Sequence, residues 1–490
     1  MKLPVLTDRR MLGLLLGPCL FILILLFPPP EAMSVSAWRV VAVTVLMAIW
    51  WISEAIPIAA TSLLPVALFP SLHVMTTTTT TAAYANHLVF LFLGGFLIAM
   101  AMQKWNLHRR ITLYTIRAVG VNPSRIILGF MLATAFLSMW ISNTATAMMM
   151  LPIALAVAGQ FINDKTDDIP ATTSPFALAL MLGIAYSASI GGVATLIGTP
   201  PNAILAGIVE RIYQHRISFA AWMAFGLPLS MVMLTIAWIY LTRFAYPVKQ
   251  QASNQVTDVI QQEIKQLGSM SRPEKLVAII FAFVAMIWIG RGLFDITLLK
   301  GVSDASIAMA GALLLFIIPV RFEFTSIQQG EFLLDWATAA KLPWDILILF
   351  GGGFALAQGF SDSGLTEWIV TQMGILKNAP LVVLVLMITF VVIFLTEVTS
   401  NTATATLTLP VLGALALAVG VEPMSLMVPA TVAASYAFML PVATPPNAIV
   451  FSSRYVTIPQ MARAGFFMNL IATLVITLFV MVVLPLIENI

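Results

Sequence analysis

The amino-acid sequence predicts an all-α protein that crosses a membrane many times, and its composition and its apolar runs lead to this expectation. Of the 490 residues, 60% are apolar and only 9% are charged, whereas soluble proteins carry roughly 25% charged residues. The apolar residues form long runs, and 11–30 and 466–487 each reach the length of about 20 residues that a helix needs to cross a bilayer. So few charges could not cover the surface of a soluble protein of this size.

The same composition argues against several classes of function. The formal net charge is only +3, and no basic cluster interleaves with aromatic residues, so no nucleic-acid partner is expected. The single cysteine, Cys19, cannot form an internal disulfide, and the Cys/His spacing of a structural zinc site is absent. We therefore expect a lipid bilayer as the environment and no cofactor.

The first span is expected at 11–30. Lys2, Arg9 and Arg10 precede it, and Pro28-Pro29-Pro30-Glu31 follows it in place of a signal-peptidase site. This pattern predicts an uncleaved helix with a cytoplasmic N-terminus. We assign 1–37 to this helix, outside the repeats described below.

Hydropathy predicts further candidate spans near 38–52, 55–70, 88–103, 223–243, 276–296, 305–320, 345–360 and 466–487. Other apolar regions are interrupted by polar or proline-rich sequences, namely 124–160, 174–209, 380–420 and 425–453. The polar stretch 243–275 carries five Lys or Arg residues against three acids. Because basic loops stay in the cytoplasm, we expect 244–275 to be a cytoplasmic connector between two halves.

Motifs of the first half recur in the second half in the same order. Gly94-Gly95-Phe96 returns as Gly352-Gly353-Phe354, and SNTATAMMMLP at 142–152 returns at the same shift as SNTATATLTLP at 400–410. Likewise, GTPPNAI at 198–204 returns as ATPPNAI at 443–449. The sequence therefore predicts two structural repeats, 38–243 and 276–490.

The charges of equivalent loops predict that the two repeats have inverted topology. The segment 104–125 has five basic residues and no acid, whereas its counterpart 362–383 has Asp362, Glu367 and a single basic residue. Equivalent loops should therefore lie on opposite sides of the membrane. Inverted repeats of this kind hold their substrate near the midplane, where broken helices meet.

The interrupted regions predict this meeting point. In 124–160 and 380–420 each arm has about 17 residues, too short to cross a bilayer comfortably, so re-entrant hairpins with Ser-Asn-Thr at the tip are expected. In 174–209 and 425–453 a broken helix should restart at Thr-Pro-Pro. Four half-helix N-termini would then offer N–H groups to a carboxylate or phosphate. The carbonyls that end the preceding half-helices suit Na⁺.

Other polar residues allow more than one interpretation. A single Ser or Thr in a membrane helix often bonds only to a helix backbone, although paired motifs in register argue against this. Glu397 is an intramembrane acid, for which a functional role and a capping role are both open. Glu54 is expected at a helix junction near the membrane surface. Asp164, Asp167 and Asp168 superficially suggest a Mg²⁺–diphosphate enzyme, but no second acidic motif exists and a solvated loop is favoured.

At these motifs the sequence resembles the divalent anion:sodium symporter family of di- and tricarboxylate transporters, and in particular its bacterial C4-dicarboxylate branch. WWISEAIPI at 50–58, both SNT motifs and both TPPNAI motifs carry the resemblance, which extends over almost the whole chain. It implies about eleven transmembrane helices, two hairpins, a homodimer with a scaffold domain, and elevator-type alternating access. It also implies a multi-pass protein of the cell membrane, with a bacterial inner membrane expected.

The resemblance further implies which residues form the site. One sodium site would use Ser138, Ser142, Asn143 and Gly198, and the other would use Thr396, Ser400, Asn401 and Ala443. The dicarboxylate would contact Asn143, Thr144, Thr199, Ser400, Asn401, Thr402, Thr444 and Pro445. Ser138 and Thr396 are related by the same shift as the SNT motifs, so internal symmetry supports the cation assignment independently. Gly198 and Ala443 differ, but each can contribute a backbone carbonyl.

The function implied is secondary active import of succinate, malate or fumarate, or of a tricarboxylate, coupled to Na⁺. The nearest alternative is a sodium-independent dicarboxylate or citrate exchanger on the same fold. The intramembrane Mg²⁺–diphosphate enzyme is a remote alternative, and a channel is disfavoured because half-helix motifs build occluding sites instead of a continuous polar lumen. The expected partners are a small dicarboxylate anion, Na⁺, lipid and a second copy of the chain.

Overall fold

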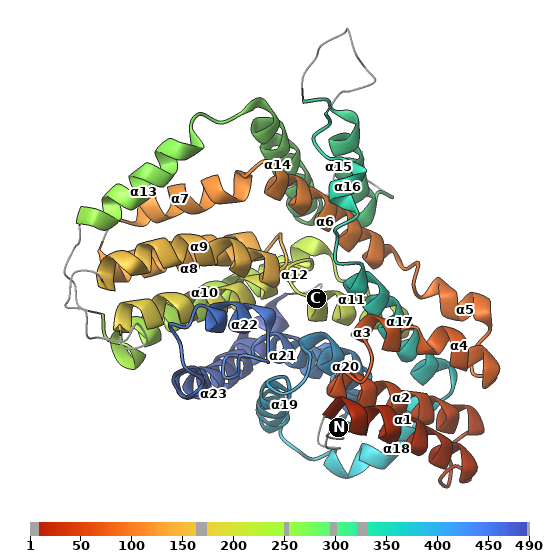
Figure 1. The fold of residues 1–490 in the computed structure, drawn as a ribbon. Helices are drawn as coiled ribbons and strands as arrows, with labels where there is room; N and C mark the ends of the chain where they lie inside the picture. The colour runs from red at the N-terminus through yellow and green to blue at the C-terminus, as the bar shows by residue number, and fades with distance from the viewer. Residues whose placement is uncertain are drawn as a thin grey trace, which may run out of the picture.

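The computed structural model of the protein describes residues 9–120, 122–162, 174–248, 254–294, 301–320 and 331–487. Within these ranges the regular secondary structure is helical, apart from one isolated β-bridge between Pro319 and Phe332. Figure 1 shows the helices as long rods that lie side by side in bundles. The predicted all-α class is confirmed.

Nine helical segments of the described residues are long and apolar enough to span a membrane: Arg9–Leu26, Val35–Ser53, Thr77–Lys104, Pro175–Val193, Phe219–Ala245, Arg272–Gly292, Trp344–Asp362, Asn401–Val419 and Ile458–Leu486. Shorter apolar helices of 10–17 residues accompany them. The protein is therefore a multi-pass membrane protein, as expected. How many times the chain crosses depends on how the short helices pair, so the count of eleven stays a prediction.

The N-terminal helices pack closely through small residues. α1 (Arg9–Leu26) lies against α2 (Val35–Ser53), and Trp50 Nε1 donates a hydrogen bond to Gly13 O at 3.1 Å. The candidate span near 55–70 corresponds to the short apolar stretch Ile58–Ser71, which is divided into α3 (Ile58–Thr61) and α4 (Leu64–Ser71). Pro65 stands in the first turn of α4, where its missing N–H does no harm, so it starts a new helix.

The first half continues with α5 (Thr77–Ala82), α6 (His87–Lys104), α7 (Leu107–Val119), α8 (Pro123–Ser138), α9 (Asn143–Ile162), α10 (Pro175–Val193), α11 (Pro200–Tyr213) and α12 (Phe219–Ile239). A π-helical turn, Tyr240–Ala245, extends α12. The predicted connector 244–275 contains α13 (Asn254–Leu267), and α14 (Arg272–Leu293) begins inside it. A capping box of Ser271 and Glu274 sets this start.

The second half continues with α15 (Asp304–Ile317), α16 (Trp336–Ala339), α17 (Trp344–Asp362), α18 (Leu365–Gln372), α19 (Leu381–Leu395), α20 (Asn401–Val419), α21 (Met424–Ser435), α22 (Pro445–Ser452) and α23 (Ile458–Val483). Short 3₁₀ turns follow α18 and α23, at Met373–Leu376 and Leu484–Leu486. α23 begins earlier than the predicted 466, because Thr457 and Gln460 form a capping box. The order α6 to α12 matches the order α17 to α23, element by element.

The centre of the protein is α10, which is buried along its whole length. It contacts α8, α9, α12 and α22, so it is apolar on every side. α1, by contrast, exposes most of its side chains, as a lipid-facing helix does. Figure 1 shows α8, α9 and α10 stacked as neighbouring rods. The breaks that the sequence predicted lie at the ends of these central helices.

Candidate functional site: a cavity between four helix breaks

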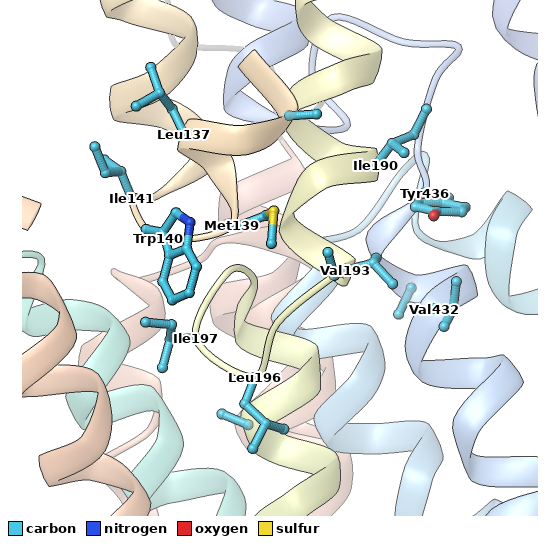
Figure 2. Packing of buried hydrophobic residues seen from close by; sticks show 14 of the residues in the cluster. Leu137, Met139, Trp140, Ile141, Ile190, Val193, Leu196, Ile197, Val432 and Tyr436 are labelled. Atoms are coloured by element: carbon cyan, nitrogen blue, oxygen red, sulfur yellow. The ribbon is translucent and has the colours of Figure 1, made fainter. Parts of the chain in front are cut away.

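The first break separates α8, which ends at Ser138, from α9, which begins at Asn143. Trp140 lies buried in this break, and Figure 2 shows it beside Ile197. Its ring lies 5.0 to 6.4 Å, between centroids, from the rings of Phe219, Phe281 and Trp288. These aromatic contacts anchor the break as a defined turn. The structure thus places a turn at the predicted hairpin tip.

The second break separates α10 from α11 and is bridged by the side chain of Asn202. Its Nδ2 donates to Gly192 O at 3.3 Å, Val193 O at 3.3 Å and Thr195 O at 2.7 Å. Trp222 Nε1 of α12 also donates to Val193 O, at 2.9 Å. Carbonyls at the end of a helix lack intrahelical partners. The Asn202 amide and the Trp222 indole supply those partners and so stabilise the non-helical segment between α10 and α11.

The second half repeats this arrangement. α20 begins at Asn401 after the break that follows α19, and α22 begins at Pro445 after Thr444. Asn447, the counterpart of Asn202, donates from Nδ2 to Ala437 O at 3.1 Å and Leu440 O at 3.0 Å. The asparagine of each TPPNAI motif therefore satisfies the carbonyls of the preceding break.

A hydroxyl and an amide meet behind each hairpin tip. Ser138 Oγ donates to Asn143 Oδ1 at 2.6 Å and lies 2.7 Å from Ala188 O. In the second half Thr396 Oγ1 donates to Asn401 Oδ1 at 2.8 Å and lies 3.0 Å from Ala434 O. Ser138 and Thr396 are both fully buried. The two halves thus build the same cluster of oxygens from Ser or Thr, Asn and a helix-end carbonyl.

One end of the Asn143 amide faces oxygens only. It lies 2.6 Å from Ser138 Oγ, 3.1 Å from Ala188 O and 3.2 Å from Gly198 O. With the amide nitrogen at this end, Asn143 donates to all three. With the amide oxygen there, four oxygens lie close together and the Ser138 hydroxyl donates to the amide oxygen; oxygens so grouped are ligands that a hard cation takes. This donor set fits Na⁺.

Two glycines make the first break compact. A Cβ atom on Gly198 would collide with the carbonyl of Gly192, and a Cβ on Gly192 would lie 2.7 Å from Asn143 Oδ1. Neither position has room for a larger residue. The second half carries Ala437 and Ala443 at the equivalent positions.

The four breaks border one cavity of about 560 Å³. Its lining contains every predicted site residue except Ser138 and Thr396, namely Ser142, Asn143, Thr144, Gly198, Thr199, Ser400, Asn401, Thr402, Ala443, Thr444 and Pro445. Apolar side chains complete the wall, among them Phe92, Phe96 and Leu349. The sequence motifs therefore come together in space, from both halves of the chain.

Helix N-termini contribute to the electrostatics of the cavity, together with the side-chain charges of Arg9, Glu54 and Asp345. The N-termini of α9, α11, α20 and α22 all border it. Helix N-termini present the positive end of the helix dipole and N–H groups, although α11 and α22 each begin with two prolines, which have no N–H. Neither Thr199 nor Ser400 uses its hydroxyl to cap its own helix. Among the lining residues Arg9 is the one basic side chain. Hydroxyls, amides and N–H groups therefore remain to bind an anion.

Charged residues lie at the edge of the cavity. Glu54 ends α2 in a left-handed conformation, so the structure places it at the predicted helix junction. Arg9 and Arg10 approach its carboxylate to 3.6 and 3.4 Å. Asp345 also lines the cavity. Because these side chains are largely exposed, their pairing contributes little to stability.

Glu397 has a capping position. Its carboxylate is buried and accepts from the N–H groups of Phe438 at 2.7 Å, Met439 at 2.9 Å and Leu440 at 3.1 Å. Asn469 Nδ2 of α23 also donates to it, at 2.8 Å. The acid therefore ties the α19 end of the hairpin to the unwound segment after α21. It does not line the cavity.

Comparison with known families decides the class of the protein. A model described as the sodium:sulfate symporter transmembrane region matches residues 8–487. The chain belongs to this family. As a sodium:sulfate symporter family member it is a membrane transporter and not an enzyme. Asp164, Asp167 and Asp168, on which the enzyme alternative rested, lie outside the described residues.

Curated members of the sodium:sulfate symporter family are similar along nearly the whole chain. The sodium-dependent dicarboxylate transporter SdcS of Staphylococcus saprophyticus is 46% identical over 479 residues, which cover 97% of this chain and 92% of the relative. SdcS of Staphylococcus aureus is 46% identical over 492 residues, covering 98% and 92%. This extent also confirms the resemblance that the motifs indicated.

Two solved transporter structures share the fold of this symporter family member. The YdaH transporter of Alcanivorax borkumensis aligns with a TM-score of 0.57 over 91% of this chain and 99% of its own, at 12% identity. MtrF of Neisseria gonorrhoeae aligns with a TM-score of 0.55 over 96% and 95%, also at 12% identity. At this identity the likeness concerns the fold alone.

Sequence reasoning missed several residues that shape the site of this symporter family member. Asn202 and Asn447 were not singled out, although each stands at the same place in its TPPNAI motif. The recurrence of the motif could have identified both asparagines. The carbonyls of Ala188 and Ala434 carry no such signal, because a backbone oxygen has no residue type and its position depends on packing.

Proposed function

We propose that the protein imports small dicarboxylates, such as succinate, malate or fumarate, by symport with Na⁺. The observation that carries this proposal is the convergence of four helix N-termini, two from each half, on one cavity. A dicarboxylate carries two anionic groups, and the cavity offers it two equivalent sets of donors. A volume of about 560 Å³ also suits a small organic ligand. The names of the similar SdcS proteins support this substrate class.

Sodium would occupy the two oxygen clusters behind the hairpin tips. Ser138, Ser142, Asn143 and the carbonyl of Gly198 would form one site, and Thr396, Ser400, Asn401 and the carbonyl of Ala443 the other. Short contacts within each cluster support this assignment. Hard oxygen ligands of this kind suit Na⁺, as in other transporters with broken helices.

The anion would lie on the cavity side of the same tips. Its carboxylates would contact Asn143, Thr144 and Thr199 from the first half and Ser400, Asn401, Thr402, Thr444 and Pro445 from the second half. Because Asn143 and Asn401 face both the cation and the anion, bound Na⁺ orders the residues that receive the substrate. Coupling of this kind is reciprocal, so the substrate raises the affinity for Na⁺ by the same factor.

Alternating access would proceed by an elevator-type movement within a homodimer. The smaller of two hydrophobic clusters joins residues of α2, α4, α17, α18 and α20, and α17 and α20 also contribute to the larger cluster around α10. Figure 1 shows α2, α4, α17 and α18 along one side of the molecule. Basic loops support a cytoplasmic N-terminus, and we place the protein in a bacterial inner membrane.

The test is uptake of radiolabelled succinate into proteoliposomes that contain only this protein and no internal dicarboxylate. An inward Na⁺ gradient is compared with the same gradient of K⁺. Uptake with Na⁺ alone supports symport. Uptake that requires preloaded dicarboxylate, whichever cation is present, overturns symport and identifies the exchanger alternative.

A further inference from the structure

A second cavity lies between the end of α12 and the beginning of α23. It measures about 480 Å³ and shares no lining residue with the first. One wall is the π-helical turn, with Tyr240, Phe244, Ala245 and Tyr246; the other is α23, with Pro459, Gln460, Arg463, Ala464 and Phe467. We call it the π-turn groove.

Two hydrogen bonds between its walls fix the shape of the groove. Tyr240 Oη donates to Ala464 O at 3.2 Å, and Tyr246 Oη donates to Gln460 O at 3.0 Å. These two carbonyls lie one turn apart on α23, so the tyrosines fasten the π-helical turn to that helix. π-Helical turns are rare and often occur at functional sites. Here the turn forms one wall of the groove.

The groove lies at the membrane surface. The candidate span Phe219–Ala245 ends at one wall, and the candidate span Ile458–Leu486 begins at the other. Phe244 and Phe467 are 73% and 48% exposed, so the groove opens toward the apolar phase. Aromatic residues are enriched at this depth of a bilayer. A ligand of the groove must therefore be amphipathic.

The charge of the groove is basic and uncompensated. Arg463 is exposed, and no ion pair to it is found among the described residues. The sequence contains no Asp or Glu between 211 and 257 or between 423 and 487, the stretches that include both walls. A guanidinium beside apolar rings can hold a phosphate, whereas the cationic group of a zwitterionic lipid finds no carboxylate here.

We propose that the π-turn groove binds an anionic glycerophospholipid, with its phosphate on Arg463 and an acyl chain along Phe244 and Phe467. Basic pockets between membrane helices on the cytoplasmic side are known to hold anionic head groups. The exposed Arg243 and Arg454 lie on neighbouring helix ends and mark this side as the basic one. The anionic cytoplasmic leaflet is then the source of the lipid.

The test is native mass spectrometry of the full chain in a neutral detergent, titrated with phosphatidylglycerol or with phosphatidylcholine. The wild-type protein is expected to retain phosphatidylglycerol in preference. The variant Arg463→Gln should bind it about fivefold more weakly, since one basic side chain near the surface contributes about that factor. Arg463→Lys should recover part of the affinity, and the control Arg454→Gln should bind as the wild type does.

A second variant places a negative charge in the groove. Phe244→Glu changes an exposed side chain, so the fold should persist, and its carboxylate should repel the phosphate. Equal retention of both lipids by the wild type, or unchanged phosphatidylglycerol binding by both Arg463→Gln and Phe244→Glu, would overturn the proposal. Displacement of the lipid by millimolar inorganic phosphate would also overturn it, because the groove would then be a site for free anions.

Discussion

Asn143 and Asn401 each stand at a helix N-terminus, the amide of each is hydrogen-bonded to a buried hydroxyl, and each lines the cavity. Replacing either with Ala removes an oxygen of a cation cluster and a contact to the anion. We predict that Asn143→Ala and Asn401→Ala each abolish Na⁺-driven succinate uptake while the protein still inserts into the membrane. Uptake into proteoliposomes and the yield of membrane-extracted protein provide the two measurements.

The hydroxyl behind each amide offers a graded control. Ser138→Thr keeps the oxygen and should retain some transport, whereas Ser138→Ala removes it and should weaken the dependence on Na⁺. Normal uptake by both Asn variants would show that the site residues are wrongly assigned.

Asp335, outside the spans, gives a pH dependence. Lys104 Nζ donates to its carboxylate at 2.7 Å, and this hydrogen bond, with a further one from Thr338 N, lowers the pKa of Asp335 from 3.8 to about 2. A pKa lowered by folding adds stability that is complete above the unfolded value and is lost as the pH falls through the folded one. We predict that Asp335→Asn lowers the melting temperature slightly between pH 5 and 8. The difference should shrink as the pH falls from about 4 to about 2, as thermal unfolding scans of both proteins would record.

At the scale of the element, the unwound segment after α21 depends on Glu397. Its two oxygens accept from three backbone N–H groups and from Asn469. Glu397→Gln replaces one acceptor oxygen with a donor, which leaves a buried N–H without a partner. We predict a loss of about 1–3 kcal/mol in stability and a strong loss of transport. The exposed Glu54→Gln serves as the control in thermal unfolding and uptake. A Glu397→Gln variant as stable as the control would contradict the capping role.

The breaks of these elements could be predicted, because Ser-Asn-Thr and Thr-Pro-Pro sequences interrupt apolar runs and recur. The division of 55–70 into α3 and α4 was missed although the run contains Pro57, Pro65 and Pro70, because proline in an apolar run is also compatible with a single kinked helix. The contacts of Glu397 could not be foreseen either. They join α19, the segment after α21, and α23, and that meeting depends on tertiary packing.

At the scale of the whole molecule, ligands that bind only the folded protein raise its stability. We predict that Na⁺ raises the melting temperature relative to K⁺, and that succinate adds to this only when Na⁺ is present. At about one hundred times its dissociation constant, a ligand contributes about 2.7 kcal/mol. Thermal unfolding in four buffers, with either cation and with or without succinate, measures this coupling. Equal stabilisation by succinate in K⁺ would argue against cation coupling.

The sequence also predicted the class of the whole molecule, because low charge and long apolar runs admit few other folds. The duplication was visible as well, because the SNT and TPPNAI motifs recur in the same order. The joint position of all four breaks around one cavity was expected only from the general behaviour of inverted repeats. The π-turn groove had no sequence signal, since no motif marks a π-helical turn.

The close passage of Gly192 and Gly198 has a consequence for the history of the two halves. An ancestral copy with alanines could become the glycine version by simple loss of methyl groups, after which the backbone could tighten. The reverse change, from glycine to alanine, is disfavoured because a methyl group on Gly198 would collide with the Gly192 carbonyl. Ala443→Gly should therefore be tolerated and Gly198→Ala should not. After such tightening, the break of the second half, with its two alanines, could no longer replace the break of the first half.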